Sequence, residues 1–194
     1  MSLDQHIEKK TKIIGLGHRV GVGKDTAAVY LEKILKSKQY SVARESFAYE
    51  MKKIAHQLYG WAGLREPEYY DTFYEEKDRP LPKIGMTVRQ CWIGVGNRMR
   101  DVYAYTWVQI LKHKHKGVDY LIVPDVRFYA EVEWVESEGG MLIRVDNPRI
   151  PNRTDGADDI LKDFDRWHHL VVNDSDLVSL FYKLEDLVNR GCLC

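Results

Sequence analysis

The sequence has few cysteines, no net charge and no long hydrophobic run, and each of these shortages excludes a class of protein. Its 194 residues include three cysteines, an odd number that builds no disulfide framework and fits a reducing compartment. The 29 basic and 29 acidic side chains cancel, so no overall field favours a nucleic-acid polymer. No apolar stretch is long enough to cross a bilayer, and the first ten residues are polar and charged. We therefore expect a cytoplasmic protein that binds neither a membrane nor a nucleic-acid polymer.

Apolar runs alternate with segments of helical periodicity along the chain. Buried strands are predicted at 12–16, 120–123, 141–145 and 170–172, with a weaker candidate at 40–47. Helices are predicted at 26–38, 48–59, 87–116 (two helices, broken near Asp101), 128–138 and 176–190, the last capped by Asp174 or Ser175. This alternation predicts an α/β fold with a mostly parallel five-stranded sheet that helices cover on both faces. Ligands of such sheets bind beyond the carboxyl ends of the strands.

Two segments break the alternation within what we expect to be a single domain over residues 1–194. Residues 60–86 are rich in Tyr, Glu, Asp and Pro, and residues 147–167 are polar and carry several arginines. Long irregular segments of compact domains are often binding loops or lids. We therefore interpret 60–86 as an insertion on the side of the site where a second ligand, the acceptor, would bind, and 147–167 as a lid. The aromatic cluster at 69–74 either stacks on a base or forms a small local core.

The strongest motif is a glycine-rich loop between the first predicted strand and the first predicted helix. Residues 17–26 read Gly-His-Arg-Val-Gly-Val-Gly-Lys-Asp-Thr, and a strand before the loop with a helix after it is the context of a phosphate-binding P-loop. Glycines such as Gly21 and Gly23 let backbone N–H groups turn toward phosphate oxygens. The match is imperfect, because His18 stands where the motif has its first glycine.

Four charged or hydroxyl side chains of this loop are candidates for the nucleotide site. Lys24 is expected to reach the outer phosphates, and Thr26 to offer its hydroxyl to Mg²⁺. Asp25 would lie in the first turn of a helix, where an acid offsets the helix dipole and lies close to the phosphates. For Arg19, contact with phosphate and simple solvation are equally good interpretations.

A second candidate site element is an acid at the end of another buried strand. Asp125 follows Leu-Ile-Val-Pro, and in P-loop enzymes an acid in this place helps to hold Mg²⁺. Pro124 cannot donate to the sheet ladder and therefore predicts the strand end. Arg127 follows at once, and it either faces the site or pairs with Glu131 one helical turn later.

Taken together, these residues resemble the deoxynucleoside monophosphate kinases of tailed bacteriophages. The resemblance covers roughly residues 12–188. It rests on Gly-Lys-Asp-Thr at 23–26, Ser-Phe-Ala at 46–48 before Met-Lys at 51–52, Arg-Gln at 89–90 leading to Gly96, Asp-Val-Arg-Phe at 125–128 with Glu131, the run at 139–146 and Val-Val-Asn-Asp at 171–174. This sequence departs from that family's pattern at Tyr129-Ala130 and at Asn97-Arg98, which affects the identity of the acceptor more than the type of reaction.

The resemblance implies a three-layer nucleoside monophosphate kinase-like fold, ATP with Mg²⁺, and a deoxynucleoside monophosphate (dNMP) as acceptor. It also implies the host cytoplasm as the location if the gene is a phage gene, and it leaves open whether two copies of the chain pair. Carried over by position, Lys24 and Thr26 belong to the ATP site. The residues implied for the acceptor phosphate or the transferring phosphoryl group are Lys52, Arg89, Arg100 and Arg127.

Two other functions remain open at this stage. One keeps the phosphate loop and changes the acceptor, as in a dephospho-coenzyme A kinase-like enzyme or another small-metabolite kinase. The other is a nucleotide-binding module without catalysis, and it is motivated by His18 at the first position of the loop.

Overall fold

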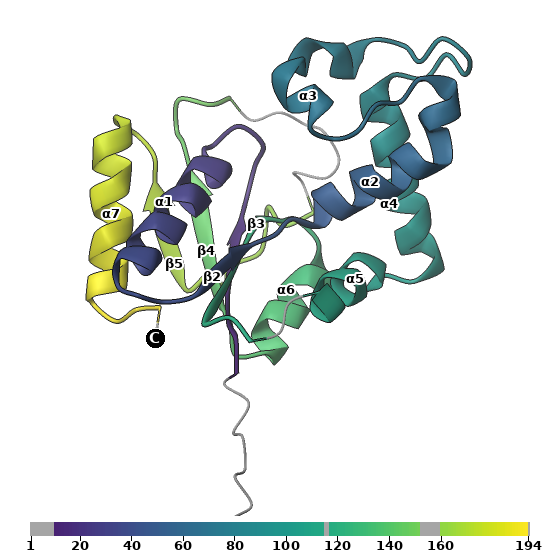
Figure 1. Ribbon diagram of the computed structural model, residues 1–194. Coiled ribbons are helices and arrows are strands. Elements are labelled where there is room, and N and C mark those ends of the chain that lie inside the picture. The colour runs from purple at the N-terminus through teal and green to yellow at the C-terminus, as the bar shows by residue number, and fades with distance from the viewer. Residues whose placement is uncertain (1–9, 115–116, 152–159, 194) are drawn as a thin grey trace, which may run out of the picture. The chain divides into compact units, whose positions relative to one another are not determined.

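The computed structural model describes residues 10–114, 117–151 and 160–193 (Figure 1). The chain divides into two compact units. The first unit combines the residues up to Glu45 with those from His113 onward, and the second comprises Ser46–Lys112.

The first unit is built on a five-stranded sheet in which every strand pairing is parallel. The strands are β1 (Lys12–Gly17), β2 (Val42–Arg44), β3 (Tyr120–Val126), β4 (Met141–Asp146) and β5 (His169–Val172). Their order across the sheet is β2-β3-β1-β4-β5, which places β1 in the centre. The predicted α/β fold with a five-stranded parallel sheet is therefore confirmed. The edge strand β2 is shorter than expected, since it covers only three residues of the predicted 40–47.

Helices cover both faces of this sheet. Figure 1 shows α1 (Lys24–Ser37) and α7 (Leu177–Asn189) side by side on one face, and α6 (Tyr129–Ser137) on the other. The side chains of β1 alternate accordingly. Ile14 and Leu16 belong to the apolar core shared with α1 and α7, whereas Gly15 faces Val135 of α6. Burial on both faces explains why the central strands read as nearly continuous apolar runs.

Strand β3 does not end at Pro124, so that prediction was wrong. Gly15 pairs with Val123 and Gly17 pairs with Val126, so two residues of β3 stand opposite one residue of β1. Pro124 therefore lies in a bulge, where its missing N–H costs no ladder hydrogen bond. The bulge lets the strand continue past Pro124 and carries Asp125 to the end of β1.

The second unit is helical. It contains α2 (Phe47–Tyr59), α3 (Tyr69–Thr72), α4 (Val88–Val102), most of α5 (Thr106–Lys114) and two 3₁₀ turns, η1 (Gly60–Ala62) and η2 (Tyr74–Asp78). The segment 60–86, expected to be irregular, thus folds into short helical pieces between α2 and α4. Within its aromatic cluster, Tyr70 is buried edge-on against Trp92, as expected of a small local core, while Phe73 and Tyr74 are exposed. Stacking on a base stays a prediction.

The helix ends mostly follow local chemistry that the sequence encodes. Helix α4 begins with a capping box in which the Thr87 side chain accepts from the Gln90 N–H and the Gln90 side chain accepts from the Thr87 N–H. The expected break inside 87–116 falls between Val102 and Thr106. The cap of α7 is Asp176, which accepts from the Ser179 N–H, so the prediction of Asp174 or Ser175 was wrong. Within the described ranges, no helix is both long and apolar enough to span a membrane.

Candidate functional site

The loop between β1 and α1 has the backbone that a phosphate cradle needs. Gly21 and Gly23 take positive φ values of 81° and 100°, a region that glycine enters without strain. Gly23 is also the N-cap residue of α1, and no side chain caps this helix end. The first N–H groups of α1 therefore point out of the helix at its partially positive end, which favours an anion there.

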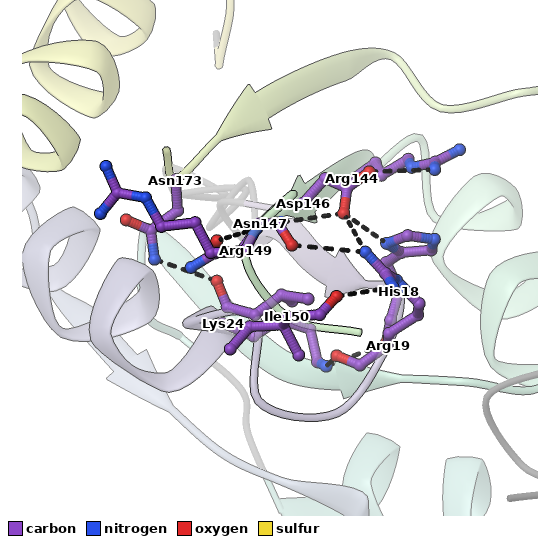
Figure 2. Close-up of polar contacts among 10 residues, drawn as sticks. His18, Arg19, Lys24, Arg144, Asp146, Asn147, Arg149, Ile150 and Asn173 are labelled. Carbon is purple, nitrogen blue, oxygen red and sulfur yellow. Dashed lines mark hydrogen bonds and ion pairs between the residues drawn. The ribbon is translucent and has the colours of Figure 1, made fainter. Parts of the chain in front are cut away.

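Lys24 lies folded over this loop. Its side chain is buried, and its Nζ donates to the carbonyl oxygen of His18 at 2.9 Å and to that of Arg19 (Figure 2). Two carbonyl oxygens offer an ammonium group only partial negative charge. Phosphate oxygens carry more charge, so a bound polyphosphate would compete well for the same donor.

Oxygen donors suited to Mg²⁺ lie on α1, which follows the loop, and on β3, which pairs with β1. Thr26 is half-buried in the first turn of α1, next to the exposed Asp25. Asp125 immediately precedes Val126, the residue of β3 that pairs with Gly17. The part of the chain that the structure describes contains no group of three His, Cys, Asp or Glu side chains fit to hold a metal by themselves. These oxygen donors fit Mg²⁺, which takes one or two protein ligands and completes its shell with substrate phosphates and water.

Asp146, at the end of β4, is a site residue that the motif analysis did not single out. Its Oδ1 accepts from Arg19 at 2.7 Å and from the Asn147 N–H at 2.8 Å, and its Oδ2 accepts from Arg144 at 3.2 Å (Figure 2). Burial opposes ionisation here, but the hydrogen bond from Arg19 and the neighbouring positive charges hold the pKa of Asp146 below its usual value. An acid ending an apolar strand was the signal that identified Asp125, and it would have identified Asp146 too.

Arg19 ties the loop to the chain beyond β4. Besides Asp146, it donates to the carbonyl oxygens of Ile150 at 3.1 Å and Asn147 at 3.4 Å. These contacts belong to the start of the predicted lid, 147–167. Residues 152–159 of that segment lie outside the described residues. Its last part is packed, since Leu161 and Phe164 are buried and Trp167 stacks edge-on against Phe164.

His18 holds a backbone conformation that normally requires glycine. Its φ is 100°, in the left-handed region that side chains with a Cβ rarely enter. The imidazole is only 8% exposed, and its Nδ1 lies 3.6 Å from Asp146 Oδ1. Burial, followed by the charge of Arg144, lowers the pKa of His18 to about 4, so the ring is neutral at pH 7. His18 thus reproduces the turn of the missing glycine while its ring packs against the end of β4.

The strain at His18 can be measured by comparing two variants that both lack the ring. His18→Gly should be more stable than His18→Ala by about 1 kcal/mol, because alanine must also take the positive φ whereas glycine does so freely. Thermal and urea unfolding of both variants would measure the difference. Equal stability would mean that the loop relaxes to a negative φ once the ring is gone.

Asn173, just after the edge strand β5, supports the loop. Its Nδ2 donates to the Val22 carbonyl oxygen at 3.0 Å (Figure 2). A Cβ on Gly23 would lie 2.5 Å from that Nδ2. Gly23 therefore has two reasons to be glycine: its positive φ and the close approach of Asn173. The sequence signal for Asn173 was its place in the 171–174 motif, which indicated no role.

The residues predicted for the acceptor fall in both units. Arg127 follows β3 in the first unit, and its backbone N–H donates to Glu131 Oε2 at 2.7 Å. Lys52, Arg89 and Arg100 lie in the second unit, on α2 and α4. Arg89 forms two hydrogen bonds to Asp78, at 2.9 and 3.3 Å, and this pairing raises the pKa of the guanidinium. The structure thus places Asp125 beside the end of β1, where the loop begins, and it gives Arg89 an acidic partner.

A parallel sheet of order β2-β3-β1-β4-β5, with a glycine-rich loop between β1 and α1, defines the class of P-loop α/β proteins. No protein-family model matches the sequence. A curated protein of Acanthamoeba polyphaga mimivirus named "Putative deoxynucleotide monophosphate kinase" is 25% identical over 199 residues, covering 92% of this chain and 97% of the viral protein. This relative confirms the resemblance that the motifs indicated.

A solved structure agrees on the fold. TT1252 from Thermus thermophilus superimposes with a TM-score of 0.50 at 16% identity, covering 94% of this chain and 98% of that chain. An APS kinase of Mycobacterium tuberculosis, solved with AMPPNP and APS, gives a TM-score of 0.48 at 14% identity, covering 93% and 98% of the two chains.

Proposed function

We propose that this chain transfers the terminal phosphoryl group of ATP to a dNMP. The observation that carries the proposal is the loop from His18 to Lys24, whose backbone and helix N-terminus suit the phosphates of a nucleotide. The acceptor comes from the motif resemblance and from the name of the viral relative, which aligns over nearly its whole length.

The chain's own residues suit a reaction that needs positioning and positive charge more than covalent chemistry. The N–H groups of the loop and of α1 would hold the phosphates, and Lys24 would exchange the carbonyls of His18 and Arg19 for outer phosphate oxygens. Thr26 and Asp125 would hold Mg²⁺, which, when bound, offsets the charge on the phosphates. The acceptor phosphate is already ionised near pH 7, so no general base is required.

An ATP-consumption assay tests the function directly. We expect turnover with one or more dNMPs, and little with AMP, dephospho-coenzyme A or no acceptor. Turnover only with dephospho-coenzyme A would replace the acceptor and keep the class of enzyme. ATP binding without turnover on any acceptor would support the non-catalytic module that His18 brought into consideration.

The role of Asp125 can be separated from that of Asp146 by Mg²⁺ titration. Asp125→Asn should raise the Mg²⁺ concentration for half-maximal activity by about tenfold or more, because one anionic oxygen near the metal is lost. Asp146→Asn should leave that midpoint unchanged, since Arg19 and Arg144 already occupy its carboxylate. If only the Asp146 variant moved the midpoint, the metal would belong to the end of β4 instead.

A further inference from the structure

Two lysines of the second unit converge on one indole ring. Lys52, from α2, places its Nζ 4.9 Å from the centre of the Trp92 ring. Lys77, from η2, places its Nζ 6.0 Å from the same ring and 4.0 Å from that of Tyr74. Trp92 comes from α4, so three separate elements of the unit meet at this point.

Among the residues that the structure describes, no acidic side chain pairs with either lysine. Lys77 is only 8% exposed. In the described ranges 10–114, 117–151 and 160–193, neither lysine forms a hydrogen bond or an ion pair with a protein group. Burial and then the charge of Lys52 lower the pKa of Lys77, and Asp71 offsets this only in part. Burying an ammonium group beside a second one is unfavourable. A cation–π contact with a ring face offsets only part of the hydration free energy that is lost.

Arg89 adds a third positive charge and marks where the cluster reaches the surface. Its charge also acts on Lys77, although its own guanidinium is paired with Asp78. The Arg89 side chain is 43% exposed and Tyr74 is 57% exposed. Two neighbours of Lys77 therefore face solvent, so the cluster lies close to the surface of the unit.

We propose that Lys52 and Lys77, above the ring of Trp92, bind the phosphate monoester of the acceptor nucleotide. The dianionic phosphate would neutralise the two ammonium groups, and both lysines would donate hydrogen bonds to its oxygens. That the phosphate belongs to a nucleotide rests on the proposed function, whereas the anion site itself rests on the buried ammonium group of Lys77 beside the half-buried Lys52. Lys77, a residue that no motif assigned to the site, would then be the contribution of the segment 60–86 to acceptor binding.

Calorimetric titration without ATP tests the site, with a dNMP, its deoxynucleoside and inorganic phosphate as the three ligands. Wild type should bind the dNMP and, more weakly, inorganic phosphate, and should bind the deoxynucleoside at least about tenfold more weakly than the dNMP. Lys77→Met and Lys52→Met should each raise the Kd for the dNMP by about tenfold or more. Lys77→Arg should retain most of the affinity, because it keeps the charge.

Lys83→Met is the matched control. Lys83 also lies over an indole in the same unit, 5.9 Å from the centre of the Trp61 ring, but it is exposed. Its removal should change the Kd by less than about twofold. Circular dichroism of each variant would show that the helices remain. Unchanged dNMP affinity in both Lys77→Met and Lys52→Met, or equal affinity for the dNMP and its deoxynucleoside, would overturn the proposal.

Kinetics separate a failure of this site from a failure of the proposed function. If wild type transfers phosphate to a dNMP and Lys77→Met leaves the KM for that acceptor unchanged, the function stands and the site is wrong. If wild type phosphorylates no dNMP but binds inorganic phosphate through Lys52 and Lys77, the function is wrong and the site stands.

Discussion

Replacing Lys24 by methionine should lower the rate of phosphoryl transfer by roughly a hundredfold to a thousandfold. The substitution keeps most of the buried stem and removes the ammonium group that lies over the loop. Loss of a single preorganised donor to the transferring group typically costs about 3–4 kcal/mol of transition-state stabilisation. Steady-state kinetics with saturating ATP and dNMP would measure it.

Lys33→Met is the control for this experiment, because Lys33 is an exposed lysine of the same helix, α1. Its turnover should match wild type. Melting temperatures of the two variants would separate a lost catalytic charge from a damaged fold. Turnover of a correctly folded Lys24→Met within about threefold of wild type would remove Lys24 from the phosphate site and, with it, the P-loop interpretation.

The largest loss of stability is expected for Gly17→Ala. A Cβ at Gly17 would lie 2.2 Å from Cη2 of Trp167 and 3.0 Å from the Val126 carbonyl oxygen. Trp167 cannot withdraw easily, because it packs edge-on against the buried Phe164, with ring centres 5.0 Å apart. Overpacking of this kind costs about 3 kcal/mol, which corresponds to a fall in Tm of roughly 10 °C for a chain of this size.

The cause can be checked with a control and a second-site variant. Gly94→Ala should be neutral or stabilising by up to about 1 kcal/mol, because Gly94 lies inside α4 and a Cβ there meets nothing within 4 Å. Combining Gly17→Ala with Trp167→Leu should cost less than the sum of the two single changes, because the clash is relieved. Strict additivity would mean that the clash with Trp167 is not the source of the loss.

The parts of the fold that the sequence predicts well are those where local pattern and tertiary packing agree. The apolar runs of β1, β3 and β4 are buried on both faces, and the loop before α1 is specified by its glycines. The bulge at Pro124 was missed because it depends on the register between β3 and β1, which single-strand patterns do not contain.

The site shows the same division. Lys24, Asp125 and the loop glycines could be found because a motif or a strand end marks them. Asn173 and Trp167 could not, because their role is a contact with Gly23 or Gly17 across more than a hundred residues of sequence. Lys77 is hidden for another reason: an acidic, tyrosine-rich segment suggests a solvated loop, and only the packing around Trp92 shows that this lysine is buried.

The hydrogen bond from Asn173 to the Val22 carbonyl joins residues 151 positions apart. It has a consequence for how the protein forms during synthesis. The loop leaves the ribosome well before its support, which arrives only with β5, and domains fold as their pieces emerge. A ribosome-bound chain that ends before β5 should therefore present a glycine loop without its final shape. Nucleotide affinity would then appear late and abruptly, as a sign that the last strand has joined the sheet.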